Sequence, residues 1–116
     1  MKIKTVLTLS VVIFAASIIA QSSTYAPGEA AKHVGETATV TGTVDGVHQS
    51  GKGNIFLNMG KYPNQPFTAF IPSSSSTQFS NPQQYESRMM SVSGKISLYK
   101  GKPEIIVNSP SQISVR

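Results

Sequence analysis

Small apolar residues alternate with hydroxyl residues at positions 37–44, and this alternation is the clearest structural signal in the chain. The segment reads TATVTGTV, so every second side chain points to the same face of an extended strand. Gly46 and Val47 break the phase, which predicts a bulge or bend at that point. The positions expected on the buried face are Ala38, Val40, Gly42 and Val44.

Two shorter segments, residues 54–59 (NIFLNM) and 67–71 (FTAFI), predict the second and third strands. Residues 60–66 (GKYPNQP) form a turn-rich connection between them. The side chains expected to point inward are Ile55, Leu57, Met59, Phe67, Ala69 and Ile71. The side chains expected to point outward are Phe56, Asn58, Thr68 and Phe70.

The C-terminal part of the chain predicts two further strands. Residues 89–99 (MMSVSGKISLY) alternate over their whole length, and residues 104–107 (EIIV) follow a tight turn at 100–103. Residues 108–112 (NSPSQ) then bend the chain before its last few positions. The side chains expected on the inward face of the longer strand are Met90, Val92, Gly94, Ile96 and Leu98.

Two short helices are expected between and before these strands. Residues 29–34 (EAAKHV) have a helix-forming composition. Asn81 and Pro82 suit the N-cap and the first position of a second helix at 82–87. Residues 73–80 (SSSSTQFS), which precede that helix, are expected to form a polar loop.

The predicted order is therefore three strands, a short helix and two strands. Together with an interior glycine in the first and fourth strands, this order is typical of the OB-fold, a five-stranded Greek-key barrel with a helix between strands three and four. A sandwich would usually need more strands from a larger chain. We expect an all-β fold with short helices, in one domain at 29–116.

The N-terminal residues predict a secretory signal peptide at 1–22. A short basic start containing Lys2 and Lys4 precedes the apolar run VLTLSVVIFAASIIA at 6–20, which is shorter than the ~20 residues of a membrane-spanning helix. Cleavage after Ala20 or after Ser22 would fit. We therefore expect an exported protein, periplasmic or secreted, with no stable membrane span after cleavage and a flexible lead-in at 23–28.

The composition of the chain excludes several kinds of chemistry and bears on the charge of a possible partner. The chain of 116 residues has no cysteine, which excludes disulfides, thiol catalysis and thiolate metal sites. Loss of Lys2 and Lys4 with the signal peptide lowers the formal net charge of +5 by two. The remaining mildly basic chain permits an anionic partner without requiring one.

Three segments resemble OB-fold nucleic-acid-binding domains: residues 40–44 (VTGTV), 56–60 (FLNMG) and 94–107 (GKISLYKGKPEIIV). The anticodon-binding domains of aminoacyl-tRNA synthetases are one such relative, and the OB domain of secreted bacterial nucleases and small exported bacterial proteins is a closer one. The resemblance implies that Phe56 stacks a nucleobase. The motifs specify the fold better than the ligand, because OB-folds also bind oligosaccharides and proteins.

OB-folds usually bind ligands across strands two and three and the flanking loops. Aromatic side chains there could stack bases, and lysines could neutralise phosphates. The alternative is that the phenylalanines pack beneath a loop and the lysines only aid solubility. The candidate nucleic-acid-binding residues are Phe56, Asn58, Lys61, Tyr62, Thr68, Phe70, Lys52, Tyr99, Lys100 and Lys102.

No residue pattern supports catalysis, a cofactor or a metal ion. The only candidate metal-binding pair is Glu29 and His33, and a solvated helix face is the better explanation of their spacing. We therefore expect a monomeric, non-catalytic module that binds single-stranded DNA or RNA weakly and non-specifically. The alternative is a periplasmic or secreted module that binds an envelope protein, a small ligand or an oligosaccharide.

Overall fold

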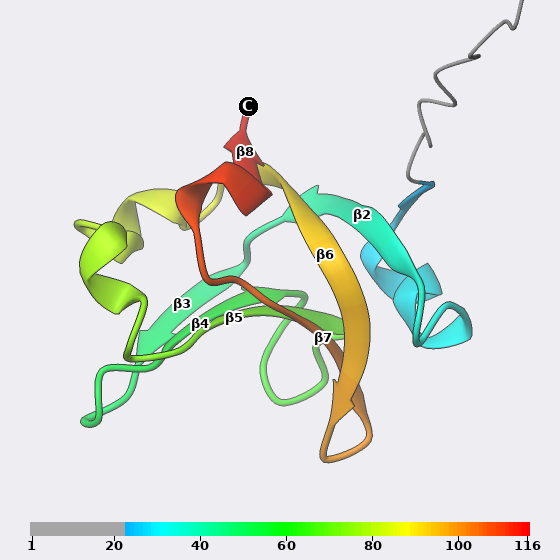
Figure 1. Ribbon diagram of the computed structural model, residues 1–116, viewed down its shortest axis with the longest axis horizontal. Coiled ribbons are helices and arrows are strands. Elements are labelled where there is room, and N and C mark those ends of the chain that lie inside the picture. The colour runs from blue at the N-terminus through cyan, green and yellow to red at the C-terminus, as the bar shows by residue number, and fades with distance from the viewer. Residues whose placement is uncertain (1–22) are drawn as a thin grey trace, which may run out of the picture.

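The computed structural model describes residues 23–116, so the predicted signal peptide lies outside the described residues. Within this range the chain forms eight strands and four short 3-10 helices (Figure 1). The strands are β1 (Thr24–Tyr25), β2 (Thr37–Thr43), β3 (Gly46–Gln49), β4 (Ile55–Met59), β5 (Phe67–Ile71), β6 (Met89–Tyr99), β7 (Lys102–Ile106) and β8 (Ile113–Val115). The helices are η1 (Pro27–Lys32), η2 (Ser76–Gln78), η3 (Pro82–Tyr85) and η4 (Pro110–Gln112).

The strands form one mixed sheet in the order β1-β2-β6-β7-β5-β4-β3, and β8 adds to β6. Although β2 and β3 lie at distant places in this order, only residues 44–45 separate them in the sequence. They are the two parts of the predicted first strand, and the break falls at the predicted bend. The sheet therefore curls on itself, with β5 and β7 running parallel, and the result is an all-β, OB-like fold.

The long strand β6 joins the two parts of the curled sheet. Its first seven residues pair with β2, and its last four pair with β7 (Figure 1). Gly94 lies close to the point where β6 stops pairing with β2 and begins to pair with β7. A Cβ atom on Gly94 would lie 2.7 Å from Cγ2 of Ile105. A glycine at this position therefore lets β7 approach β6 closely.

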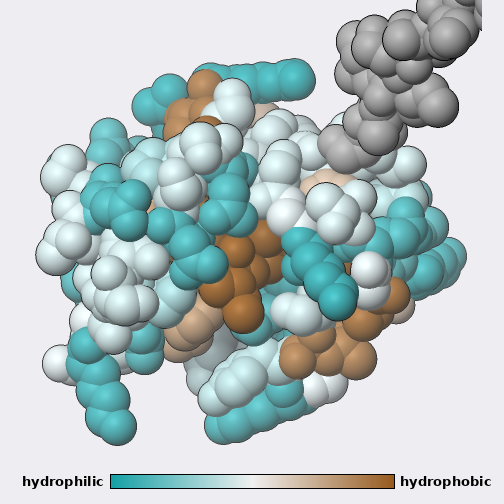
Figure 2. Space-filling view, in the orientation of Figure 1, coloured by the Kyte–Doolittle hydropathy of each residue, from teal (hydrophilic) through white to brown (hydrophobic). Residues whose placement is uncertain are grey.

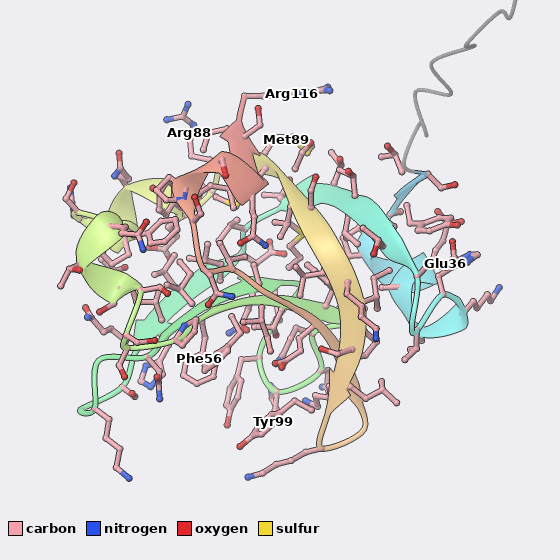
Figure 3. All side chains as sticks on the ribbon, in the orientation of Figure 1. Glu36, Phe56, Arg88, Met89, Tyr99 and Arg116 are labelled. Atoms are coloured by element: carbon pink, nitrogen blue, oxygen red, sulfur yellow. The ribbon has the colours of Figure 1, made fainter. Side chains whose placement is uncertain are left out.

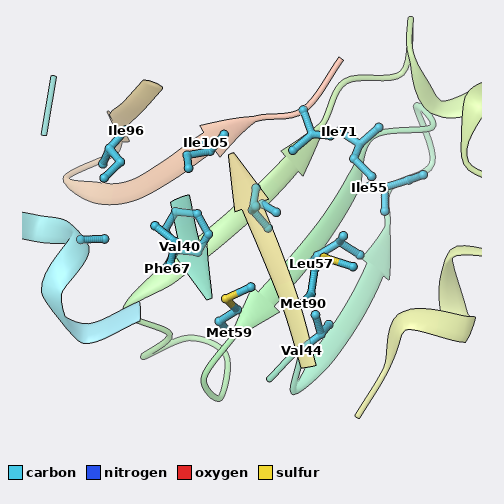
Figure 4. Close-up of a cluster of buried hydrophobic side chains, with 14 of the residues drawn as sticks. Val40, Val44, Ile55, Leu57, Met59, Phe67, Ile71, Met90, Ile96 and Ile105 are labelled. Carbon is cyan, nitrogen blue, oxygen red and sulfur yellow. The ribbon is translucent and has the colours of Figure 1, made fainter. Parts of the chain in front are cut away.

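Apolar side chains from the inward faces of the strands meet in one core (Figure 4). The inward sets predicted for the second and third strands are all buried, and the largest of these side chains is Phe67. Asn58 and Thr68, expected on the outward face, are also buried, and two apolar positions differ from the expectation. Phe79, in the predicted polar loop, is buried, whereas Leu98 is 54% exposed because it lies near the tip of the β6–β7 hairpin, beyond the core.

The exposed surface is mainly hydrophilic on the face shown in Figure 2, with apolar side chains gathered in a few separate patches. Leu98, Tyr99 and Ile106 are among the exposed large apolar residues of the described chain. The two tyrosines with the greatest exposure are Tyr62 and Tyr99, and both are among the candidate binding residues.

Both predicted helices form as 3-10 segments, and the second is shorter than predicted. The expected helix at 29–34 is η1, which begins earlier, at Pro27, because this ring packs against β2. A Cβ atom on Gly42 of β2 would stand 2.4 Å from Cγ of Pro27. The expected helix at 82–87 is the single turn η3, and the Asn81 side chain makes no capping hydrogen bond.

The segment at 23–28, expected to be a flexible lead-in, pairs with the sheet. Strand β1 runs parallel to β2, and the amide of Thr39 donates to the carbonyl of Ser23 at 2.9 Å. The Tyr25 ring stacks on the His33 ring with centroids 3.7 Å apart. The Tyr25 hydroxyl donates to Glu36 Oε1 at 2.8 Å, and His33 Nδ1 lies 2.5 Å from Glu36 Oε2.

We call Tyr25, His33 and Glu36 the N-terminal clasp. The clasp replaces the expected pairing of His33 with Glu29, because the Glu29 carboxylate instead accepts from the amide of Ala26 at 3.1 Å. The two side chains of the candidate pair, Glu29 and His33, therefore have different partners.

The N-terminal clasp should weaken in acid. Hydrogen bonds from Tyr25 and His33 lower the pKa of Glu36 below its usual 4.5. A lowered pKa means that the stabilisation is complete above about pH 4.5 and is lost as the pH falls through the folded-state value. We expect the hydrogen-exchange protection factor of the Thr39 amide to fall in this acid range. Glu36→Gln should give low protection that does not change with pH, and equal acid sensitivity in both proteins would contradict the prediction.

Candidate functional site

A row of aromatic side chains crosses the outer face of β3, β4 and β5. The strand register places His48 opposite Phe56 and Phe56 opposite Phe70. The ring centroids are 5.9 Å apart for His48 and Phe56, and 5.2 Å apart for Phe56 and Phe70. We call these three residues the aromatic row. The alternation of β4 and β5 points both phenylalanines away from the core, as the sequence predicts, and both remain partly exposed.

A polar row lies beside the aromatic row on the same face, two residues along the strands. Asn58 pairs with Thr68, and Thr68 pairs with Glu104 on β7. The Thr68 hydroxyl donates to Asn58 Oδ1 at 3.0 Å, and Gln65 Nε2 donates to the Thr68 hydroxyl at 3.4 Å. Asn58 and Thr68 are only 6% and 7% exposed, so these two predicted contact residues lie at the floor of the site rather than on an open face.

A groove of about 790 Å³ runs over this face. It brings together seven of the ten predicted residues, from β4, β5, the connection at 60–66 and the β6–β7 hairpin. These seven are Phe56, Asn58, Tyr62, Thr68, Tyr99, Lys100 and Lys102. Phe56 and Tyr99 extend to the same side of the sheet, away from the core (Figure 3).

The other three predicted residues lie elsewhere. Phe70 lines a smaller adjoining pocket of about 120 Å³, together with Phe56 and Tyr99. Lys52 and Lys61 line neither the groove nor this pocket. Both are exposed in loops, so the structure does not gather all the predicted lysines into one strip.

Two loops meet at one rim of the groove. The Lys102 ammonium donates to the carbonyl of Pro63, which connects the β6–β7 turn to the 60–66 connection. The Lys100 ammonium lies 5.4 Å from the centroid of the Tyr99 ring. We call Lys100 and Lys102 the basic rim. Tyr62 and Tyr99 are 77% and 55% exposed, so their rings are available to a ligand beside these charges.

The groove residues missed by the sequence analysis include three with polar or titratable side chains: His48, Gln65 and Glu104. Glu104 follows Lys102 by two positions on β7, so strand alternation could have identified it had the strand been started at its true first residue. Burial raises the pKa of Glu104 above its usual 4.5. His48 lies just past the bend between β2 and β3, which resets the alternation.

Two further kinds of feature are absent from residues 23–116. That part of the chain holds no cluster of three or more histidine and carboxylate side chains arranged to bind a metal ion. It also contains no helix that is both long enough and apolar enough to span a membrane.

Comparison with known proteins supports the fold but assigns the chain to no family. No protein-family model matches the chain, and no curated protein matches it by sequence. Two solved structures have a similar backbone: an aspartyl tRNA synthetase from Entamoeba histolytica (TM-score 0.56, 18% identity) and a Leishmania major Friedlin protein assigned to the aspartyl-tRNA synthetases (TM-score 0.53, 11% identity). Each match covers 86% of this chain and 22% of the other chain. At these identities the likeness concerns the fold alone, and it supports the OB-like architecture.

Proposed function

We propose that this chain is an exported, non-catalytic OB-fold module that binds single-stranded nucleic acid in the groove, weakly and with little sequence preference. One observation carries the proposal: the groove places the exposed rings of Tyr62 and Tyr99 and the partly exposed ring of Phe56 beside the basic rim. In this proposal β2 and β3 form the first strand of a five-stranded barrel, to which β1 and β8 are additions. The apolar run at 6–20 supports export.

The chemistry of the groove suits a flexible anionic polymer with planar bases. Every base has a π-face, so stacking on aromatic side chains tolerates any sequence. Lysine ammonium groups neutralise phosphates without reading bases. Only two lysines line the groove, and Glu104 lies among them, so we expect weak binding. The two structural neighbours are aspartyl-tRNA synthetases, so a fold of this kind also occurs in proteins that act on tRNA.

The proposal predicts that binding depends on salt through the basic rim. A labelled single-stranded oligonucleotide, followed by fluorescence anisotropy, should bind at low salt, and log affinity should fall linearly with log salt concentration. Reversing both charges in Lys100→Glu/Lys102→Glu should weaken binding and reduce the magnitude of the slope by about 1.4, since each phosphate contact on a single strand contributes about 0.7.

A charge-matched control separates the site from overall net charge. Lys32 and Lys95 are exposed and do not line the groove, so Lys32→Glu/Lys95→Glu makes the same change in net charge elsewhere. This control should leave the slope nearly unchanged. Absence of binding by the wild-type protein at high micromolar concentration and low salt would overturn the proposal.

The second candidate is a module that binds an envelope protein, an oligosaccharide or another small ligand. It is favoured by the smaller pocket, which is lined by Asn54, Phe56, Phe70, Tyr99 and Glu104 and by no lysine. Isolation of the tagged protein from an envelope fraction, followed by mass spectrometry, would identify a protein partner if this candidate is correct.

A further inference from the structure

The smaller pocket combines aromatic rings with a carboxyl group. Phe56 and Phe70 lie 5.2 Å apart between ring centroids, and their planes are inclined by 50°. Tyr99 and Glu104 complete the lining, together with Asn54. The three rings come from β4, β5 and β6, and Glu104 comes from β7, so the strands of the sheet fix all four positions.

Glu104 has no cationic partner in the structure. The ion pair formed within residues 23–116 joins His33 and Glu36, far from this pocket. Neither of the two groove lysines forms an ion pair with Glu104, since Lys102 donates to the Pro63 carbonyl and Lys100 lies over the Tyr99 ring, one wall of the pocket. Burial without a compensating charge disfavours the ionised carboxylate, which agrees with the raised pKa of this group.

We propose that the pocket binds an organic ammonium group, with Phe56, Phe70 and Tyr99 surrounding the cation and Glu104 as its counter-charge. Aromatic faces carry negative electrostatic potential and attract cations, and this is how quaternary ammonium groups are recognised in aromatic cages. A carboxylate at the same place adds a direct charge interaction and repels phosphate. The ammonium group belongs either to a free quaternary compound or to a lysine side chain of a partner protein.

The two proposals share Phe56, Tyr99 and Glu104, which line both the groove and the smaller pocket, but they predict opposite effects of the Glu104 charge. Phosphates would lie at the basic rim, which lines the larger groove but not the smaller pocket. Removal of the Glu104 charge should therefore weaken ammonium binding while oligonucleotide binding is kept or becomes tighter.

The first experiment compares a cation with its neutral isostere on the wild-type protein. Choline, Nα-acetyl-lysine methylamide and 3,3-dimethyl-1-butanol, the uncharged carbon analogue of choline, are titrated while amide chemical shifts of Phe56, Phe70 and Glu104 are followed by NMR. At least one cation should bind with millimolar affinity, and the neutral isostere should bind about tenfold more weakly or not at all. Binding of choline alone indicates a free quaternary ligand, and binding of the lysine derivative indicates a protein side chain.

The second experiment removes the charge and keeps the shape. Glu104→Gln should weaken cation binding by about tenfold, since the direct charge interaction between the carboxylate and the cation is lost. Glu86 is exposed and does not line the pocket, so Glu86→Gln is the matched control and should bind like the wild type. The proposal is overturned if no cation binds, if the neutral isostere binds as well as choline, or if Glu104→Gln retains full affinity.

Discussion

Phe67→Ala is expected to lower the free energy of unfolding by about 3–5 kcal/mol, the usual cost of deleting a buried phenylalanine ring. Phe67 is fully buried and lies in the core between the two parts of the curled sheet (Figure 4). Small domains have a total stability of about 5–15 kcal/mol, so this change should leave a substantial fraction unfolded at moderate denaturant concentrations. Urea denaturation followed by circular dichroism measures the effect.

Two control variants, Phe67→Leu and Tyr62→Ala, separate loss of buried volume from the general effect of removing an aromatic ring. The leucine keeps most of the buried apolar volume, so it should cost less than the alanine. Tyr62 is 77% exposed, and its truncation should change stability by no more than about 0.5 kcal/mol. A loss below about 1 kcal/mol for Phe67→Ala would mean that this ring is not part of the core.

Strand alternation predicted the core well because burial on one face leaves a period of two in the sequence. The predicted bounds of β5 and β6 agree with the structure at both ends. The bend between β2 and β3 was also predicted, because Gly46 and Val47 interrupt that period. In each case the physical cause is local: neighbouring residues must alternate between the core and the solvent.

Elements that depend on distant contacts were predicted less well. Phe79 is a single apolar residue in a serine-rich run, so no periodic pattern of apolar residues predicts its burial. The two residues of β1 are too few to show a pattern, and their position depends on pairing with β2 and on the N-terminal clasp. The helix η1 begins early because Pro27 packs on Gly42, a contact between segments that are 15 positions apart.

The β6–β7 turn explains why part of the site was missed. Residues 100–103 were expected to form the turn, whereas Tyr99 pairs with Lys102 and the turn has only two residues, Lys100 and Gly101. Both have positive φ angles, as a type I′ hairpin turn requires. Strand β7 therefore begins two residues earlier than predicted, and Glu104 falls on the groove face together with Lys102.

Phe56→Ala is expected to give the largest loss of oligonucleotide affinity among single substitutions in the groove. Phe56 lies in the middle of the aromatic row, between His48 and Phe70, and lines both the groove and the smaller pocket. Removal of one stacking platform costs about 1–3 kcal/mol, which corresponds to a weakening of roughly fivefold to more than a hundredfold. Fluorescence anisotropy at fixed low salt measures the change.

Two variants separate stacking from apolar contact. Phe56→Leu keeps an apolar side chain without a π-face, so it should lose most of the affinity that the alanine loses. Leu98→Ala removes an exposed apolar side chain that does not line the groove, so it should bind like the wild type. Because Phe56 also contacts its two ring neighbours, circular dichroism must first show that the fold is kept. A folded Phe56→Ala protein with unchanged affinity would exclude the aromatic row as the binding surface. Loss of affinity in both Phe56 variants, with wild-type affinity in Leu98→Ala, would assign base stacking to the Phe56 ring.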